Sequence, residues 1–431
     1  MTENMPDETQ SDTSELTSVF PTTDLDLREG ADACYKCTSC DVSCPVATVD
    51  DSFPGPKFQG PEQWRLTRKS DEGIDSSIMD CSNCFRCESA CPSDVPLTQM
   101  HNTARAKYVE QSQSRISRRY LRNWLLANYE TAGWIGSRVP RISNLILNSF
   151  VFRWLGERVL GITRHRDFPA FAGETFRSWW ESHNTSPKDE AQTEKTIVYF
   201  HGCYSNYNTP DVAKSTVRVL EEFGYNVIVP PQRCSGTPML ANGMMKMAQS
   251  AAETNIQELS GALKQGRAVV TSCTSCSFAI RKEYPELFDL DGVSTVAENT
   301  FDAIEFLRVH ENLDEVIKDL SPAHSPLVYH APCHARNQGI HRQIVDLFAQ
   351  HEHVHITDVG DSCSGISGTY GWKAEHYDTS MAIGSEMFSK MHAAPGTIGI
   401  TECPTCAMQM NHGTGYAIQH PMQLIEQILV E

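Results

Sequence analysis

The chain has 431 residues, a formal net charge of −18 and an apolar fraction of 40%, which is enough for two or three folded domains. Its acidic balance argues against nucleic acid as a partner, because phosphate binding needs concentrated lysine and arginine. No basic-then-apolar leader and no apolar run of 18 residues is present, so we expect neither a signal peptide nor a transmembrane helix.

The first segment, residues 1–32, carries nine acidic residues and one basic residue with little apolar content. Such a segment cannot bury enough apolar surface to offset the entropy lost on ordering. We therefore expect a disordered acidic tail.

Two cysteine runs with the same spacing, C-x2-C-x2-C-x3-C-P, follow the tail. They contain Cys34, Cys37, Cys40 and Cys44, and then Cys81, Cys84, Cys87 and Cys91. Disulfides are typical of small exported domains, whereas thiols this regularly spaced in a large chain indicate metal binding. The spacing is that of bacterial ferredoxins, in which the fourth cysteine of each run ligates the other cluster.

The runs therefore predict a ferredoxin-type domain over residues 33–110 with two 4Fe-4S clusters. Cluster 1 is assigned Cys34, Cys37, Cys40 and Cys91, and cluster 2 is assigned Cys81, Cys84, Cys87 and Cys44. Zinc also accepts four thiolates, but its sites usually pair two C-x2-C knuckles and have no use for a third cysteine two residues further on.

A basic and aromatic segment lies between the halves of the chain, within a predicted helical linker over residues 111–190. Residues 115–177 contain eleven arginines and four acidic residues. One predicted helical face carries Leu121, Trp124 and Leu125, and a second stripe carries Leu147, Phe150, Val151, Trp154 and Leu155. Helices with this pattern can lie on an anionic lipid surface, or they can pack on the protein body or on another subunit.

The last eight cysteines form an internal repeat, with unit 1 over residues 191–322 and unit 2 over residues 323–431. The first unit holds Cys203, Cys234, Cys273 and Cys276, and the second holds Cys333, Cys363, Cys403 and Cys406. Three of the four recur after 130 residues and one after 129. Each unit thus reads C…CSG…C-x2-C.

Short β-branched runs precede these cysteines, such as residues 196–200 and 326–330, and helical patterns such as residues 211–224 separate them. This alternation predicts parallel βαβ units with four thiolates gathered at strand ends. The expected fold class is α+β multidomain: a mainly helical two-cluster ferredoxin domain, an amphipathic helical linker and two repeated α/β units. Buried core cysteines and zinc sites are the alternatives for these eight residues.

The chain resembles the iron–sulfur subunits related to heterodisulfide reductase, and within them the family of anaerobic glycerol-3-phosphate dehydrogenase C subunits. The resemblance covers residues 34–431 and rests on the eight ferredoxin cysteines and stretches outside them, including "FPGPKFQGPE", "FHGCYSNYN", "EYPEL" and "GTYGWKAEHYDTSMAIG".

This chain departs from the wider family in the middle motif of each unit, which often reads Cys-Cys-Gly there and reads Cys-Ser-Gly here. Four cysteines suit one ordinary 4Fe-4S cubane per unit, so we expect up to two further clusters and no disulfide-reducing centre. Ser235 and Ser364 are expected to tune a neighbouring thiolate rather than to ligate iron. His201, His330 and His334 lie beside the cysteines and are expected to bond carbonyls, with proton transfer or iron ligation as alternatives.

The resemblance implies an electron-transfer subunit without its own substrate site. Its partners would be a flavin-bearing glycerol-3-phosphate dehydrogenase subunit, a companion subunit and a membrane quinone, with residues 115–177 on the lipid surface. It implies a peripheral location on the cytoplasmic face of the membrane. No G-x-G-x-x-G fingerprint is present, so we expect no flavin or NAD in this chain. Subunits of glycolate or D-lactate oxidases, a heterodisulfide reductase-like enzyme and a zinc-stabilised scaffold are the alternatives.

Overall fold

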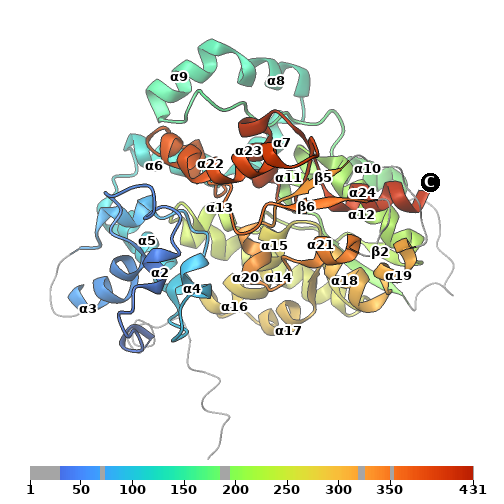
Figure 1. Ribbon diagram of the computed structural model, residues 1–431, viewed down its shortest axis with the longest axis horizontal. Coiled ribbons are helices and arrows are strands. Elements are labelled where there is room, and N and C mark those ends of the chain that lie inside the picture. The colour runs from blue at the N-terminus through green and yellow to red at the C-terminus, as the bar shows by residue number, and fades with distance from the viewer. Residues whose placement is uncertain (1–29, 68–72, 185–194, 319–325, 350–353, 431) are drawn as a thin grey trace, which may run out of the picture.

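The computed structural model describes residues 30–67, 73–184, 195–318, 326–349 and 354–430. The acidic tail expected over residues 1–32 lies outside these ranges up to residue 29, and residues 30–32 are helical. Figure 1 shows the chain passing from a small helical region (blue) through a helical linker (teal) into two α/β units (green to red).

The region around the two ferredoxin runs is helical and has short elements separated by loops. Its elements are α2 (Ser39–Val42), η2 (Phe58–Glu62), α3 (Gln63–Thr67), η3 (Ser76–Asp80), α4 (Arg86–Ser89) and α5 (Leu97–Ser112). The apolar face of α5, with Leu97 and Met100, packs on Trp64 and on Cys87. The longest helix of this region, α5, therefore packs against the loops that carry the cysteines.

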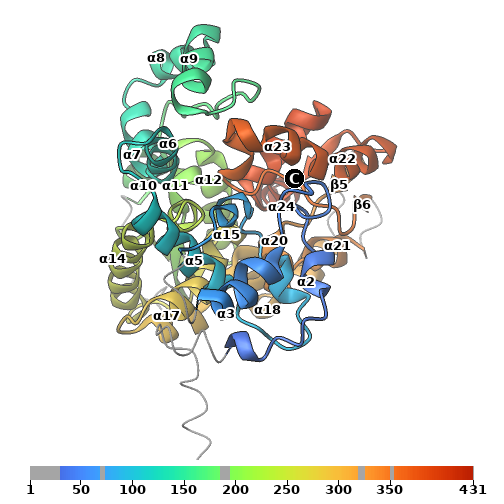
Figure 2. The same ribbon diagram turned by 90° about the vertical axis from the view of Figure 1, so that its left-hand side faces the viewer.

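The described part of the linker after α5, residues 113–184, contains five short helices. They are α6 (Arg118–Ala127), α7 (Tyr129–Gly136), α8 (Pro140–Asn148), α9 (Phe150–Leu160) and α10 (Phe176–His183). Helices α8 and α9 stand away from the body of the molecule in both views (Figures 1 and 2).

The second apolar stripe expected from the sequence is not one continuous helical stripe. Its first member, Leu147, lies in α8, and its other members lie in α9. The helix ends between them because Ser149 adopts an extended conformation and its hydroxyl accepts a hydrogen bond from the Phe152 backbone N–H, which caps α9.

Each α/β unit contains a four-stranded parallel sheet, as the alternation of strands and helices predicted. The first sheet has the order β2-β1-β3-β4 and the second has the order β6-β5-β7-β8. The strands are β1 (Thr196–Phe200), β2 (Asn226–Ile228), β3 (Val269–Thr271), β4 (Thr300–Asp302), β5 (Leu327–Tyr329), β6 (Ile356–Asp358), β7 (Ile398–Ile400) and β8 (Ala417–Gln419). The sequence patterns indicated three strands in each unit and missed the edge strands β4 and β8.

The helices of the units connect and cover these strands. In unit 1 they are α11 (Gly202–Tyr207), α12 (Pro210–Glu222), α13 (Thr237–Leu240), α14 (Met245–Leu263), α15 (Thr274–Phe278), η5 (Ala279–Glu283), α16 (Tyr284–Leu287), α17 (Val293–Glu298), α18 (Ala303–His310) and α19 (Leu313–Lys318). In unit 2 they are α20 (Cys333–Asn337), α21 (Gln343–Phe348), η6 (Tyr370–Trp372), η7 (Ala374–His376), α22 (Tyr377–Ala393), α23 (Pro404–Thr414) and α24 (Pro421–Val430).

The two units share one hydrophobic core. This core joins Ile197 and Val217 of unit 1 to Leu327, Ile400 and Ile425 of unit 2, and it includes the packing of α24 on α12. This shared core holds the two sheets together, and further apolar clusters lie on the other faces, one within unit 1 and the adjoining helices and one within unit 2.

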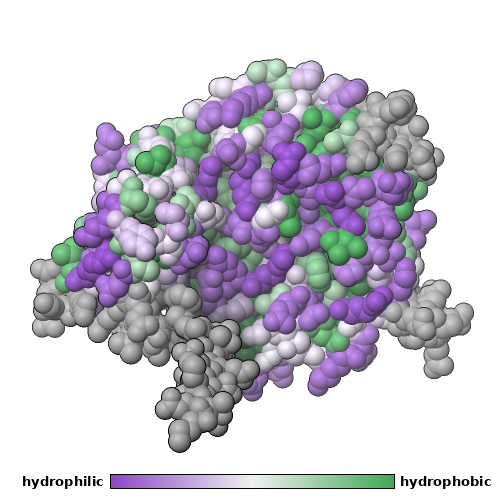
Figure 3. Space-filling view, turned by 60° about the horizontal axis from the view of Figure 1, so that its bottom comes forward, coloured by the Kyte–Doolittle hydropathy of each residue, from purple (hydrophilic) through white to green (hydrophobic). Residues whose placement is uncertain are grey.

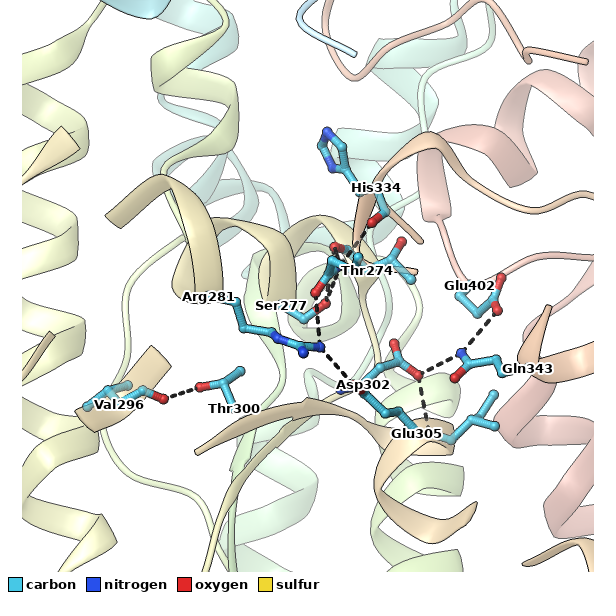
Figure 4. Close-up of polar contacts among 12 residues, drawn as sticks. Thr274, Ser277, Arg281, Val296, Thr300, Asp302, Glu305, His334, Gln343 and Glu402 are labelled. Carbon is cyan, nitrogen blue, oxygen red and sulfur yellow. Dashed lines mark hydrogen bonds and ion pairs between the residues drawn. The ribbon is translucent and has the colours of Figure 1, made fainter. Parts of the chain in front are cut away.

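A polar seam crosses the same junction (Figure 4). The Gln343 side-chain N–H group donates to the carboxyl of Asp302 at 3.1 Å and to that of Glu402 at 3.4 Å. Burial, together with the neighbouring acidic residue, raises the pKa of Asp302 to about 7 and that of Glu402 to about 8. The seam therefore fixes the carboxyl ends of β4 and β7 relative to each other.

Candidate metal centres

The outer quartet, defined as Cys34, Cys37, Cys40 and Cys91, lies at the surface. All four side chains line one small cavity together with Lys57 and Pro61. Cys37 is exposed, and the other three are half-buried. The structure thus brings the fourth cysteine of the second run beside the first three of the first run.

The inner quartet, defined as Cys44, Cys81, Cys84 and Cys87, is more deeply placed. Cys44, Cys84 and Cys87 are buried, and Cys44 packs beside Cys81. Burial and then the neighbouring thiols raise the pKa of Cys87 well above its ordinary value. Buried thiols this close resist ionisation unless a cation is bound among them, which is the behaviour of a metal-binding set.

Backbone geometry at the two runs is the same and unusual. The residues on either side of the second cysteine have left-handed conformations in both runs: Lys36 and Thr38 at φ 60° and 66°, and Asn83 and Phe85 at φ 59° and 62°. A bulky residue in this region costs about 1–3 kcal/mol, so it persists where the site requires it. Alternating right- and left-handed residues aim successive N–H groups into one concavity, a geometry that binds anions, including iron–sulfur clusters.

Two side chains of α5 that the sequence analysis missed face the inner quartet. Arg105 is fully buried and donates to the Cys81 carbonyl at 3.2 Å and to the Asn83 side chain at 2.8 Å. Burial alone would raise the pKa of Cys81, but His101 and Arg105 lower it to about 6. Their spacing of four residues on one helix was the available signal, since it places both on one face.

All eight cysteines of the α/β units line one cavity of about 400 Å³. Cys203, Cys273, Cys333 and Cys403 follow the carboxyl ends of β1, β3, β5 and β7, where ligands of parallel sheets collect. The sulfur atoms of Cys203 and Cys234 lie 3.5 Å apart, and those of Cys333 and Cys363 lie 4.0 Å apart. The repeat thus gathers two thiol quartets around a common space.

The Cys-Ser-Gly motifs turn back toward the thiols. Gly236 and Gly365 have left-handed backbones at φ 85° and 80°, and the Gly365 N–H donates to the Cys363 sulfur at 3.4 Å. The Ser364 hydroxyl lies 3.3 Å from the sulfur of Cys406. In unit 1, a hydrogen bond between Ser235 and Cys276 lowers the pKa of that thiol against the larger raising effects of Cys273 and burial. Both serines therefore contact the last cysteine of their own unit.

The three histidines beside these cysteines have different environments. Nδ1 of His201 lies 2.6 Å from the Gly202 carbonyl, whereas Nδ1 of His334 lies 2.9 Å from the Ser275 hydroxyl. Neither ring nitrogen of His330 has a hydrogen-bond partner among the described residues. Burial lowers the pKa of His201 and of His330 to about 3 and that of His334 to about 4, so all three rings are neutral near pH 7.

Direct contacts join the inner quartet to unit 2. The Asn337 side chain donates to the Cys84 carbonyl at 3.0 Å, and Arg86 donates to the Asp361 carbonyl at 2.9 Å. The rings of Phe85, Phe278 and His334 stack with centroids 4.7–5.7 Å apart. These three rings come from the second ferredoxin run, unit 1 and unit 2, so the stack locks the cysteine loops of all three together.

The donor sets fit iron–sulfur clusters. They consist of thiolates in surroundings that offer backbone N–H groups, hydroxyls and one buried guanidinium, the groups that stabilise an anionic cluster. Sets of four soft sulfur ligands do not suit calcium or magnesium, which prefer oxygen ligands.

Known proteins share these features. A family model described as a 4Fe-4S dicluster domain matches residues 30–95, and one described as a cysteine-rich domain matches residues 197–281 and 327–411. The C subunit of anaerobic glycerol-3-phosphate dehydrogenase from Escherichia coli (strain K12) is 34% identical over 401 residues, 92% of this chain and 98% of that protein.

Two more distant relatives are subunits of other enzymes. The B subunit of fumarate reductase (CoM/CoB) from Methanothermobacter marburgensis is 25% identical, with 88% of this chain and 67% of that protein covered. The glycolate oxidase iron–sulfur subunit of Escherichia coli (strain K12) is 23% identical, with 92% of this chain and 94% of that protein covered.

Fold, thiol sets and matched domains together define an iron–sulfur subunit of an oxidoreductase, with a role in electron transport. Within that class, the chain belongs to the family of the anaerobic glycerol-3-phosphate dehydrogenase C subunits. Membership in this family implies that partner subunits complete the enzyme.

Proposed function

We propose that this subunit passes electrons from a flavin-bearing partner, which oxidises glycerol 3-phosphate, to a membrane quinone. The observation that carries the proposal is the unbroken succession of thiol quartets, from the outer quartet at the surface, through the inner quartet, to the cavity with the last eight cysteines. The family relationship supports the choice of glycerol 3-phosphate as the partner's substrate.

The proposed ligands are the four cysteines of each quartet, with one 4Fe-4S cluster per quartet. When bound, such clusters supply one-electron redox chemistry. The surroundings of the quartets suggest the order in which electrons pass through them. The outer quartet faces solvent, where a partner can approach, and the inner quartet is sealed against unit 2 by Asn337 and the aromatic stack. Ser235 and Ser364 are proposed to tune the neighbouring thiolates.

Residues 115–177 are proposed to hold the subunit on lipid. Phe150 and Val151 of α9 are 69% and 70% exposed, and Leu145 of α8 is 75% exposed. Ile142, Ile146, Trp154, Leu155 and Val159 extend this exposed apolar surface. By contrast, the face in Figure 3 is mainly hydrophilic, with apolar residues in small scattered groups. None of the helices in the described parts of the chain is long and apolar enough to cross a bilayer.

Helices α8 and α9 carry Arg141, Arg153 and Arg158 and no lysine, and this basic charge favours an anionic lipid headgroup region over a neutral one. The fold positions this surface on the side of the molecule away from the ferredoxin region, since α8 and α9 project past α6 and α7 (Figure 2). Electron donor and lipid would then approach from different sides.

Co-purification tests the proposed partner. We expect a flavoprotein to accompany the chain under anaerobic conditions in mild detergent, and glycerol 3-phosphate to bleach the visible absorbance of the complex. Added naphthoquinone should then restore it. Bleaching by glycolate or D-lactate and not by glycerol 3-phosphate would assign the subunit to a different oxidase, as the relationship to the glycolate oxidase subunit allows.

Vesicle flotation tests the lipid contact. Substituting Phe150→Glu together with Trp154→Glu should abolish binding to vesicles with 30% phosphatidylglycerol. The two substitutions remove apolar side chains from the lipid contact and add two negative charges, which oppose the attraction of roughly 1 kcal/mol that each basic residue has for such a surface. Val309, which is 64% exposed on α18, offers the matched control Val309→Glu. Equal binding of both variants would rule out α9 as the lipid contact.

A further inference from the structure

We propose that the cavity with the last eight cysteines also holds the quinone ring, and that its apolar arm between α6, α7 and α9 holds the start of the quinone's chain. The inference deepens the proposed function and rests on it. It assigns the acceptor site to residues of this chain rather than to another subunit.

The lining of the cavity has two chemically different parts. One part consists of the two thiol quartets of the α/β units, and the other consists of apolar side chains of the linker. The apolar arm is formed by Leu125 and Leu126 of α6, Phe152 and Leu160 of α9, and Phe168 and Phe171 of the loop after α9. Among the described residues, Arg153 is the one side chain with a permanent charge along the whole lining.

The volume of about 400 Å³ lies in the range of small-molecule sites. The proposed clusters would take the space beside the thiols, which leaves the apolar arm for an organic ligand. Arg153 is already paired with Asp167, so a phosphorylated or carboxylated ligand in the apolar arm would bury a charge without a free partner, which is strongly unfavourable.

The thiol end points to a two-electron acceptor. Two thiol quartets face the same space, and a cluster held by each would supply one-electron chemistry. A ligand between them would then be placed to receive two electrons in succession. Reduction of a quinone requires two electrons and two protons. One electron and one proton, the proton coming from water, are taken up for each carbonyl group to give the hydroquinone. Oxidation of glycerol 3-phosphate to dihydroxyacetone phosphate by the partner releases two electrons and two protons, so the overall reaction balances.

Aromatic side chains lie where a flat ring would bind. Tyr129 and Tyr204 both line the cavity, and their rings stack at 6.2 Å between centroids. The Tyr129 hydroxyl donates to the Asn208 side chain at 2.7 Å, which fixes its position. Pairs of aromatic rings of this kind favour a third ring in offset stacking.

Helix α9 separates the cavity from the proposed lipid surface. Phe152, Gly156 and Leu160 recur every four residues and line the cavity. Phe150 and Val151, on the other side of the same helix, are exposed. A chain leaving the cavity along α9 would therefore pass directly into the lipid that the outer side of the helix contacts.

Gly156 provides a way to fill the arm without disturbing the fold. It lines the cavity, and a Cβ atom added to it would meet nothing within 4 Å. Phenylalanine is at least as favourable as glycine inside a helix. Gly261 on α14 has the same open surroundings at the exposed surface, so Gly261→Phe is the matched control.

The experiment uses the anaerobically purified complex, reduced with glycerol 3-phosphate, and two acceptors: 2-methyl-1,4-naphthoquinone and the same ring with a four-isoprene chain. We expect Gly156→Phe to slow reoxidation of the iron–sulfur absorbance by the chain-bearing quinone at least tenfold, and Gly261→Phe to leave it unchanged. Iron content and the rate of reduction by glycerol 3-phosphate should match the wild type in both. Gly156→Leu should give an intermediate rate.

The outcomes separate the two proposals. If wild type and Gly156→Phe are reoxidised equally fast by the chain-bearing quinone, the acceptor site is elsewhere and the proposed function stands. If neither quinone reoxidises the wild-type complex, the proposed function itself fails. A lower iron content in Gly156→Phe would shift the comparison to Gly156→Leu, whose unchanged rate would also overturn the site.

Discussion

The three consecutive cysteines of the outer quartet and those of the inner quartet have the same spacing and the same left-handed backbone positions beside them, yet the surroundings of the two quartets differ. Cys37 of the outer quartet is exposed, and its neighbours Tyr35 and Val42 are 83% and 75% exposed. The inner quartet packs against Cys363 and Tyr370 of unit 2. Local spacing thus sets the shape of the loops, whereas tertiary placement decides which quartet meets a partner and which one connects internal centres.

Each quartet also has one arginine at the carbonyl of its first cysteine. Arg65 donates to the Cys34 carbonyl at 3.3 Å from a half-buried position, and Arg105 donates to the Cys81 carbonyl at 3.2 Å from a fully buried one. The same contact made at different depths gives a natural pair for measuring the effect of burial on an electrostatic interaction.

The largest expected effect comes from removing one ligand of each quartet. Both Cys84→Ala and Cys37→Ala should lower the iron content by about four atoms per chain. Cys84→Ala should also lower the Tm by about 10 °C or more, because metal binding stabilises the fold where the loop packs on Asn337. Calorimetry of the anaerobic proteins measures this change. An equally large decrease in the Tm of Cys37→Ala would contradict the argument that the buried quartet contributes more to stability.

Arg105→Gln and Arg65→Gln compare the two arginines. Loss of the buried positive charge should lower the reduction potential of the inner centre by roughly 50–100 mV. Loss of Arg65 should change the outer centre by less than half as much, because solvent screens it. Redox titration followed by electron paramagnetic resonance measures both, and Arg105→Lys should restore part of the shift. Equal shifts in the two reduction potentials would show that the burial of the arginine does not change its effect on the centre beside it.

The pH dependence of stability offers a further comparison, between a buried glutamate near Arg105 and an exposed one. Burial, followed by the charge of Glu286, raises the pKa of Glu283 from 4.5 to about 8, with Arg105 acting in the opposite direction. The folded state therefore keeps a proton that the unfolded state has released, and stability falls as the pH rises from 4.5 to 8. Glu283→Gln should flatten this slope in denaturant titrations. The exposed residue Glu110 gives the control Glu110→Gln, which should keep it.

The smallest expected effect lies at the surface of the outer quartet. Tyr35→Ser should leave stability within about 0.5 kcal/mol of the wild type, because the side chain is exposed. Electron uptake from the flavoprotein should slow by about threefold, since large exposed aromatic side chains commonly contribute to interfaces. An unchanged stopped-flow rate would place the partner's contact elsewhere.

The sequence predicted the cysteine sets and most strands because both depend on short-range patterns. The run at residues 196–200 coincides with β1, and the run at residues 326–330 contains β5. The edge strands β4 and β8 have the sequences TFD and AIQ and lie outside any apolar, β-branched run, so no local pattern indicates them. Their pairing with β3 and β7 is a tertiary contact.

The surroundings of the quartets were less accessible to sequence reasoning. Arg105 and His101 lie outside any cysteine motif, and only the packing of α5 under the loops brings them to Cys81. The pattern predicts a continuous apolar stripe because Asn148 and Ser149 do not interrupt the period, although Ser149 caps a new helix there. The cysteines of both units line one cavity because the two units pack on a common core. This packing is a tertiary contact that no local sequence pattern indicates.

Metal analysis of the anaerobically purified protein, combined with electron paramagnetic resonance after reduction, tests most directly whether all sixteen cysteines hold iron. The account predicts about sixteen iron and sixteen sulfide per chain and several interacting paramagnetic signals. About eight iron atoms with stoichiometric zinc would contradict it for the α/β units, and a colourless, signal-free protein would contradict it altogether.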